Sequence, residues 1–573
     1  MQNTITIPTR SKRKFVPKNL IIDSWNKLKF LFDNLVERKI SSATELEQWM
    51  LDRSELITVI GDEIKWSIIK NKIDTTDKEL AERFLFWIKE IEPNMDPYEH
   101  KLNLKLVESP YLKELDQEKY RIYLRGVKNN IEIFREDNIP LNTTMKEKEQ
   151  EYGTIIAKMS IEVDGEKLTM QKAEHLLKNT DRKKREEIYN KLTTRRLKDE
   201  KALDDLFDEL IVLRQKIARN AGFNNYRDYM FAYLGRFDYT PKDCFNFHDA
   251  IAKEIVPIIN SFEQKRKDKL GYKSYKPWDL FVDINGFAPL KPFEGGDELT
   301  DLSVECLNRL RPYFGECLSK MKEIQHLDLE SKDGKSSGNF QMPLDEIGVP
   351  FIYMNAVGSQ SDLVFMIHEV GHAVHSFLSR NLSLIEFKHP PAEVNELASM
   401  SMELLSMDHW DVFYKDKAEL KRAKIKKLEQ ALKLLPWFAY IDKFQHWIYT
   451  TEHTAQQRKE KWLTISSELG NQILDWEGNE NAHANLWQNQ QHLYEMPFYY
   501  IEYGMAQLGA IAMWRSYKQL GEQALDNFME ALKLGYTKTI REIYETAGIK
   551  FDFSASYVKE LAEFIKDELE KSS

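Results

Sequence analysis

The sequence contains few cysteines and no long apolar run, and each absence excludes a class of protein. Its 573 residues include only Cys244, Cys306 and Cys317, an odd set without any Cys-x-x-Cys spacing. Such a set predicts neither a disulfide framework nor a metal site built from thiolates. No apolar stretch approaches the ~18 residues that cross a membrane. Residues 1–20 also lack the apolar core, roughly 7–15 residues long, of a secretory signal. We therefore expect a soluble, cytoplasmic protein with no membrane partner.

The sequence also lacks an excess of positive charge. Its formal net charge is -10 and its isoelectric point is about 5.9. A general nucleic-acid partner is not expected, because neutralising phosphates requires a basic surface. Hydrophobic residues make up 42% and charged residues 30%, which is typical of a globular protein. A chain of this length can bury a core divided into two lobes, whereas its oligomeric state stays open.

Apolar residues recur at three- and four-residue spacing over most of the chain, as in residues 20–38 and 554–573. This periodicity predicts a mostly helical protein. Pro436 is expected to end or kink the helix that contains residues 426–438. Strand signals occur in two places only: a hairpin over residues 158–170, with Asp164-Gly165 at its turn, and an extended segment over residues 338–355.

Two histidines and a glutamate interrupt a largely apolar helical pattern at residues 362–380. His368 and His372 are four residues apart, so both imidazoles project from one face of the helix. Glu369 lies between them in a His-Glu-x-x-His motif, in which two imidazoles bind Zn²⁺ and the carboxylate reaches an adjacent water. The alternative is a pair of hydrogen-bonded core histidines. His375 lies about 10.5 Å along the helix from His368, too far to share its metal, and is expected to be structural.

A zinc site needs a third protein ligand, and the predicted helix at residues 392–407 offers several carboxylates. Glu396 is the preferred ligand, because Glu393 lies at the helix start, where a carboxylate has an ordinary capping role. Ser399 and Glu403 lie on the same face as Glu396 and are expected to orient the ligands. We therefore predict one Zn²⁺ per chain.

Two other histidines, His446 and His453, are seven residues apart beside aromatic residues. No third ligand is spaced to join them, so we interpret them as packing or surface residues.

The combination of motifs resembles a known family. His-Glu-x-x-His followed by Glu396 is similar to the gluzincin arrangement, in which two histidines and a glutamate bind zinc. More closely, the pattern Glu-x-x-Ser-x-x-x-Glu formed by Glu396, Ser399 and Glu403 resembles the thimet oligopeptidase and oligoendopeptidase F family, nearer oligoendopeptidase F.

A later segment, residues 492–510, resembles the family's histidine- and tyrosine-rich element. His492 matches its histidine, and Tyr499 and Tyr503 match its tyrosines. The gap after His492 is one residue longer than expected, so Tyr499, Tyr500 and Tyr503 remain alternatives for one role.

The resemblance implies a zincin-like catalytic domain with one small sheet, and two helical lobes around a deep channel. We expect an N-terminal lobe over residues 1–190 and a catalytic domain over residues 191–573. It also implies that the extended segment pairs with the substrate backbone through Phe351, Ile352, Tyr353, Met354 and Asn355.

The implied activity is hydrolysis of internal bonds in short peptides, which are the expected partners. Zn²⁺ activates a water, Glu369 acts as general base, and His492 with Tyr499 or Tyr503 stabilises the oxyanion. Two alternatives remain: a helical peptide-binding protein without chemistry, and a zinc exopeptidase on a similar frame. The intact Glu369 argues against the first, and comparing end-blocked with free peptides separates the second.

Overall fold

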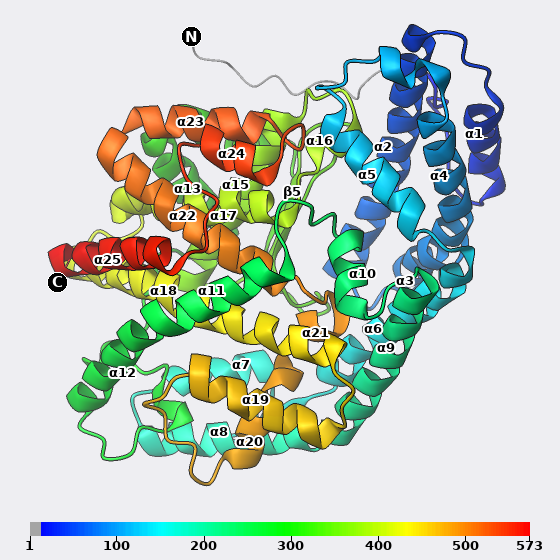
Figure 1. Ribbon diagram of the computed structural model, residues 1–573. Coiled ribbons are helices and arrows are strands. Elements are labelled where there is room, and N and C mark those ends of the chain that lie inside the picture. The colour runs from blue at the N-terminus through cyan, green and yellow to red at the C-terminus, as the bar shows by residue number, and fades with distance from the viewer. Residues whose placement is uncertain (1–12, 573) are drawn as a thin grey trace.

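Helices dominate the computed structural model, which describes residues 13–572 (Figure 1). The N-terminal helices are α1 Asn26–Glu37, α2 Ala43–Ile73, α3 Lys78–Phe86, α4 Glu92–Val107, α5 Arg121–Ile133 and α6 Ile139–Ala157. The middle of the chain forms α7 Met170–His175, α8 Arg182–Leu197, α9 Glu200–Asn220, α10 Tyr226–Tyr233, α11 Pro241–Glu254, α12 Val256–Leu270, α13 Gly295–Leu310 and α14 Pro312–Glu323. The remaining helices are α15 Gln360–Ser379, α16 Ile385–Lys388, α17 Ala392–Leu405, α18 Lys417–Thr450, α19 Ala455–Leu469, α20 Glu480–Ala484, α21 Gln491–Glu495, α22 Tyr500–Leu520, α23 Glu522–Lys533, α24 Ile540–Thr546 and α25 Ala555–Ser572. The predicted mostly helical fold is confirmed.

The predicted hairpin is present as β1 Ser160–Val163 and β2 Glu166–Thr169, which pair antiparallel. Asp164 and Gly165 join them, and both have positive φ angles, 55° and 83°. This backbone conformation suits a two-residue hairpin turn and explains the Asp-Gly pair.

A three-stranded sheet forms from β3 Leu327–Glu330, β4 Phe340–Met342 and β5 Phe351–Ala356, in the order β3-β5-β4. β5 runs parallel to β3 and antiparallel to β4. The sequence predicts that Phe351, Ile352, Tyr353, Met354 and Asn355 pair with a substrate backbone. β5 is instead the central strand, and Phe351, Ile352 and Tyr353 already pair with its neighbours. For Met354 and Asn355 the expectation stays a prediction.

Apolar side chains form two main cores. The smaller core runs from Val16 to Val127 and also includes Leu384 and Phe387 from the α16 region. The larger core begins at Tyr152 and extends to Leu569. Core membership changes between Val127 and Tyr152, and the domain boundary at residue 190 stays a prediction. Figure 1 shows the corresponding blue helices α1, α2 and α4 at one side of the molecule.

α18 continues through Pro436 as a single helix of 34 residues, so of the two expected effects of this proline, an end or a kink, the helix end is wrong. Packing outweighs the hydrogen bond that proline cannot donate. Leu432, Leu435 and Ala439 around it are fully buried, and α18 packs against α11, α19 and α22.

Across residues 13–572, no helix is both long enough and apolar enough to cross a membrane.

Candidate metal and catalytic site

α15 carries the His-Glu-x-x-His motif through the interior of the larger core. Ser359 starts the helix by accepting a hydrogen bond from the Asp362 N–H, and the Asp362 carboxylate accepts one from the Ser359 N–H at 2.9 Å. This reciprocal capping fixes the first turn. Most of the following side chains are buried, as the sequence predicts. A helix surrounded by core gives its histidines little freedom to move.

α17 supplies the third donor because it approaches α15 very closely at Gly371. A Cβ atom at residue 371 would lie 2.5 Å from the Cα of Ser399 and 2.7 Å from the carbonyl oxygen of Ala398. Only glycine permits this contact between backbones. The close approach brings Glu396, one turn before Ser399, opposite the two histidines.

His368, His372 and Glu396 form a compact donor set. Their ligand atoms all lie within 4.8 Å of one another. The Glu396 Oε2 atom is 3.3 Å from His368 Nε2 and 3.6 Å from His372 Nε2. Two imidazole nitrogens and one carboxylate oxygen are typical of a catalytic zinc site with an open position. Glu393, the alternative in the sequence, points elsewhere and accepts a hydrogen bond from Tyr239 at 2.5 Å.

Neighbouring groups hold the donors in position. His368 Nδ1 lies 2.6 Å from Glu403 Oε1, which leaves Nε2 facing Glu396. Ser399 donates to Glu396 Oε2 at 3.0 Å, and Tyr499 donates to Glu396 Oε1 at 3.0 Å. Hydrogen bonds of this kind fix the orientation and basicity of metal ligands. Ser399 and Glu403 thus lie where the sequence places them.

The charge of the site also fits a cation. Burial works against the charged imidazole, yet Glu396 and Glu403 raise the pKa of His368 well above its usual value. Burial lowers the pKa of His372 to about 4, so its ring is neutral near pH 7. Burial also opposes ionisation of Glu396, but His372 and His368 hold its pKa at about 2. Glu396 is ionised, the His372 ring is neutral, and the two carboxylates beside His368 favour a positive charge at that position. This distribution of charge suits a bound Zn²⁺ ion.

Glu369 is buried beside this donor set. Burial raises its pKa to about 7, against the opposing effect of His368. The Gln341 backbone on β4, which was not recognised from the sequence, also works against this rise in pKa. A carboxyl group with a pKa near neutrality is suited to general-base catalysis.

Lys427 on α18 is a second group that the sequence reasoning missed. Its ammonium forms a buried ion pair with Glu403, the carboxylate that orients His368. The signal was a lysine at four-residue spacing between Ala423 and Ala431, on a face of the helix that is otherwise apolar. A buried lysine there requires an acidic partner.

Removing the Glu403 carboxylate is expected to weaken metal binding. In Glu403→Gln, His368 loses an anionic acceptor and Lys427 is left buried without its counter-charge. We expect metal affinity to fall about 10–100-fold, measured by competition with a chelator. The variant Glu429→Gln, at a half-buried carboxylate on α18 that pairs with Lys433 at 3.0 Å, is the control and should retain wild-type affinity. Unchanged affinity in Glu403→Gln would contradict this role.

The tyrosine segment reaches the site through a strained turn. Phe498 has a φ of 71°, rare for a residue with a side chain. Its N–H donates to Gln445 Oε1 at 2.5 Å, and its carbonyl accepts a hydrogen bond from Arg236. These bonds hold the unfavourable conformation in place, as is common at functional sites. The turn directs Tyr499 towards Glu396.

The structure distinguishes the three candidate tyrosines. Tyr499 donates to Glu396, and Tyr500 donates to Gln490 at 2.5 Å. Tyr503 stacks on Phe438 with ring centroids 5.6 Å apart and makes no side-chain hydrogen bond within residues 13–572. The His492 ring lies 5.7 Å from the Tyr499 ring and 6.1 Å from the Tyr503 ring.

A cavity of about 870 Å³ separates the N-terminal helices from the tyrosine segment. Arg53 and Glu99 line one side, and Met496 and Tyr499 line the other. This position beside Tyr499 agrees with the channel that the sequence resemblance implies.

The fold and the site together define a helical protein with a His-Glu-x-x-His helix and a glutamate ligand on the following helix. Peptidase family M3 matches residues 175–292 and 312–563, more than half of the chain, and the Peptidase M3 N-terminal domain matches residues 20–134. The chain therefore belongs to Peptidase family M3.

Individual relatives agree with this assignment. An oligoendopeptidase F homolog of Borreliella burgdorferi is 23% identical over 386 residues, covering 66% of this chain and 63% of the relative. Oligopeptidase PepF of Bacillus subtilis is 22% identical over 307 residues, covering 53% of this chain and 45% of the relative. The chain thus matches less than two thirds of the length of either protein.

Solved structures are similar over nearly the whole chain. A structure of Pz peptidase A with an inhibitor has a TM-score of 0.91 and 26% identity, covering 97% of this chain and 99% of that one. Oligoendopeptidase F from Enterococcus faecium has a TM-score of 0.65 and 15% identity, covering 96% and 97%. The second likeness concerns the fold alone.

Proposed function

We propose that this chain is a zinc-dependent endopeptidase that hydrolyses internal bonds of short peptides. The observation that carries the proposal is the buried Glu369, with a pKa of about 7, beside a donor set of His368, His372 and Glu396. Family membership supports a peptidase, and the position of Glu369 supports a hydrolytic mechanism.

His368, His372 and Glu396 would hold one zinc ion. When bound, zinc supplies Lewis acidity that activates a water and polarises the scissile carbonyl. Glu403 keeps the His368 ring oriented, while Ser399 and Tyr499 hold the Glu396 carboxylate. These contacts prepare the donors before a substrate arrives.

Glu369 transfers the proton from the water to the leaving amine. Its carboxylate accepts a proton from the attacking water as the oxygen–carbon bond forms. The same carboxyl group then donates that proton to the departing amine as the carbon–nitrogen bond breaks. Burial matters here, because it keeps bulk water from supplying or removing the proton instead.

The free edge of β4 is the proposed site of substrate pairing, in place of β5. β4 is an edge strand of the described three-stranded sheet, and its Gln341 backbone lies close enough to Glu369 to lower the pKa of that carboxyl group. An extended peptide can add to such an edge through backbone hydrogen bonds, largely independent of its sequence. This arrangement sets the scissile bond next to the base.

Tyr503 is the proposed donor to the oxyanion, and Tyr499 the residue that holds Glu396. Tyr503→Phe should lower kcat by about 10²-fold with metal affinity unchanged, as for other oxyanion donors. Tyr499→Phe should weaken metal binding, because it removes the hydrogen bond to Glu396. Tyr500→Phe, which breaks only the bond to Gln490, is the control. Steady-state kinetics measures kcat, and competition with a chelator measures metal affinity. If Tyr499→Phe lowers only kcat and Tyr503→Phe weakens metal binding, the two roles must be exchanged.

Activity is expected to fall as the pH is lowered. Only the ionised form of Glu369 can accept a proton, so kcat/KM should decline with a one-proton slope below the pKa of this group. The pKa of Glu369 is about 7 when only protein groups surround it. A zinc ion bound next to Glu369 would lower this pKa, because a nearby positive charge favours the carboxylate. The midpoint should therefore lie below about 7. A pH profile that is flat down to pH 4 would contradict this assignment.

Hydrolysis itself is tested with an internally quenched peptide of about ten residues. Cleavage should occur with both peptide ends blocked and should stop when a chelator removes the metal. Cleavage of free-ended peptides alone would indicate an exopeptidase. Tight peptide binding without any cleavage would indicate a peptide-binding protein.

A further inference from the structure

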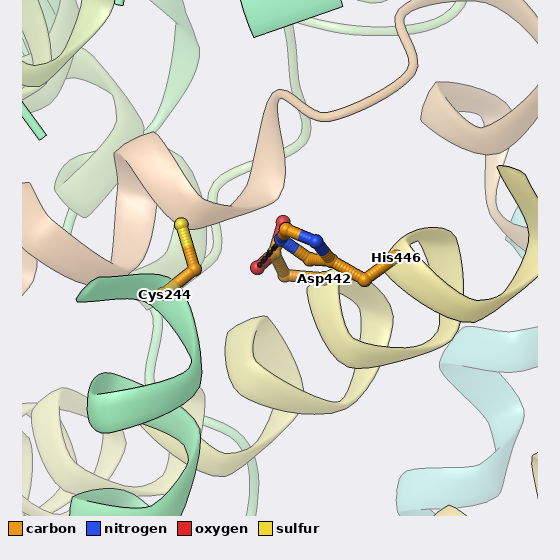
Figure 2. Close-up of side chains that lie close together, drawn as sticks. All are labelled: Cys244, Asp442 and His446. Carbon is orange, nitrogen blue, oxygen red and sulfur yellow. Dashed lines mark ion pairs between the residues drawn. The ribbon is translucent and has the colours of Figure 1, made fainter. Parts of the chain in front are cut away.

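A second group of metal-ligating side chains lies between α11 and α18, apart from the catalytic donors. We call Cys244, His248, Asp442 and His446 the α11–α18 cluster. Cys244 and His248 are four residues apart on α11, and Asp442 and His446 are four apart on α18, so each helix presents one pair on a single face. Figure 2 shows Cys244 on one side of the gap and the ion-paired Asp442 and His446 on the other.

The distances are compatible with a shared ion. Ligand atoms of Cys244, Asp442 and His446 all lie within 4.8 Å of one another. His446 Nε2 is 3.2 Å from Asp442 Oδ2, close to the ~3.3 Å that separates two ligand atoms on one tetrahedral zinc. His248 Nε2 lies 2.8 Å from the same carboxylate oxygen and fixes its orientation.

Hydrogen bonding within the described residues 13–572 leaves several of these atoms unsatisfied. Asp442 Oδ1, His446 Nδ1 and His248 Nδ1 have no hydrogen-bond partner, whereas His446 Nε2 is in ion-pair contact with Asp442 Oδ2. The side chains of Asp442 and His446 are 0% and 4% exposed, so bulk water does not satisfy them. Buried polar atoms without partners are rare and costly. Atoms of this kind, within a cluster whose Cys244, Asp442 and His446 ligand atoms lie close together, point to a bound cation.

We propose that Cys244, Asp442 and His446 bind a second zinc ion, distinct from the catalytic one. Thiolate, imidazole and carboxylate are all zinc ligands, and Asp442 can offer both oxygens, so three residues supply four donor atoms. One thiolate and one carboxylate neutralise the two charges of the ion, which suits a buried site. Binding releases the proton of the Cys244 thiol.

The sequence contains no signal for this site. Its three cysteines show no Cys-x-x-Cys spacing, and the sequence around His446 predicts a packing or surface residue. The ligands come from two helices far apart in the chain, which only the folded structure brings together. Without metal, the same residues would form a His–Asp–His ion-pair network, which is the alternative that an experiment must exclude.

A structural role follows from what α18 supports. Gln445, next to His446, accepts the hydrogen bond of the strained Phe498 N–H, and the His446 ring lies 5.5 Å from the Phe498 ring. Phe438 on the same helix stacks on Tyr503. A metal joining α18 to α11 would hold both tyrosine-supporting contacts in place.

Cobalt substitution tests the site separately from the catalytic one. The catalytic donors contain no sulfur, so only the second site can give a sulfur-to-cobalt charge-transfer band. We would produce the full chain carrying His368→Ala and His372→Ala in cobalt-containing medium, and measure metal content and the near-ultraviolet spectrum. The proposal expects about one cobalt per chain and a charge-transfer band.

Matched variants in the same background identify the ligands. Cys244→Ser should lose both the cobalt and the band, whereas Cys306→Ser, at another buried cysteine, should keep both. His446→Gln provides an independent test should Cys244→Ser fail to fold. A folded background protein without metal or band overturns the proposal, as does a band that survives Cys244→Ser. Neither result depends on peptidase activity, so the proposed function is tested separately.

Discussion

Replacing Glu369 with glutamine is expected to lower kcat/KM by about 10⁴-fold, the upper end of what a general base contributes. The amide keeps the shape and burial of the side chain but cannot accept the proton of water. The metal donors are unchanged, so metal content should equal that of the wild type. Single-turnover cleavage of a quenched peptide, with metal analysis of the same sample, measures both quantities.

The matched control is Glu393→Gln, which changes a buried glutamate one turn from Glu396 on α17. Its amide oxygen can still accept the hydrogen bond from Tyr239, so activity should remain within about tenfold of wild type. If Glu369→Gln retains activity within tenfold of wild type while Glu393→Gln does not, the base has been assigned to the wrong residue.

Much of the candidate site could be predicted because it depends on spacing within single helices. His368 and His372 lie on one face of their helix wherever that helix is placed in the fold. The same is true of Glu396, Ser399 and Glu403 on the following helix. The structure then places these two faces opposite one another. Local periodicity alone also predicts the helical fold and the Asp164-Gly165 hairpin.

Strand order could not be predicted in the same way. Residues 351–354 read as an extended segment, but which edge they expose depends on distant β3 and β4. One local signal was present: an apolar run without alternation indicates a strand buried on both faces, and residues 351–354 are all buried. That pattern is typical of a central strand and favours the shorter, half-buried β4 as the free edge.

Contacts between helices were equally invisible in the sequence. Lys427 meets Glu403, and Cys244 lies near Asp442, only because α18 packs against α11 and against α22, which itself packs on α17. No spacing rule connects residues on separate helices. The role of Gly371, within the His-Glu-x-x-His motif, could not be predicted either, because it depends on the close approach of α17 to α15.

Gly371→Ala is expected to separate α15 from α17 and to damage both stability and activity. A new Cβ atom would lie 2.5 Å from the Cα of Ser399, so the helices must move apart by about 1 Å to reach a normal contact. Overpacking against backbone should lower the free energy of unfolding by about 3 kcal/mol. Because Glu396 moves with α17, kcat/KM should fall about 10²- to 10³-fold. Denaturant unfolding and peptide cleavage measure the two effects.

Gly153→Ala separates this effect from the general preference of helices for alanine. Gly153 lies on the exposed side of α6, where an added Cβ atom has nothing within 4 Å. Alanine there should stabilise the protein by about 0.5–1 kcal/mol and leave activity unchanged. Opposite signs at the two glycines would show that the backbone contact at Gly371, and not its helical position, sets the geometry of the donors. If Gly371→Ala is as stable and as active as wild type, the approach of α17 to α15 does not control the site.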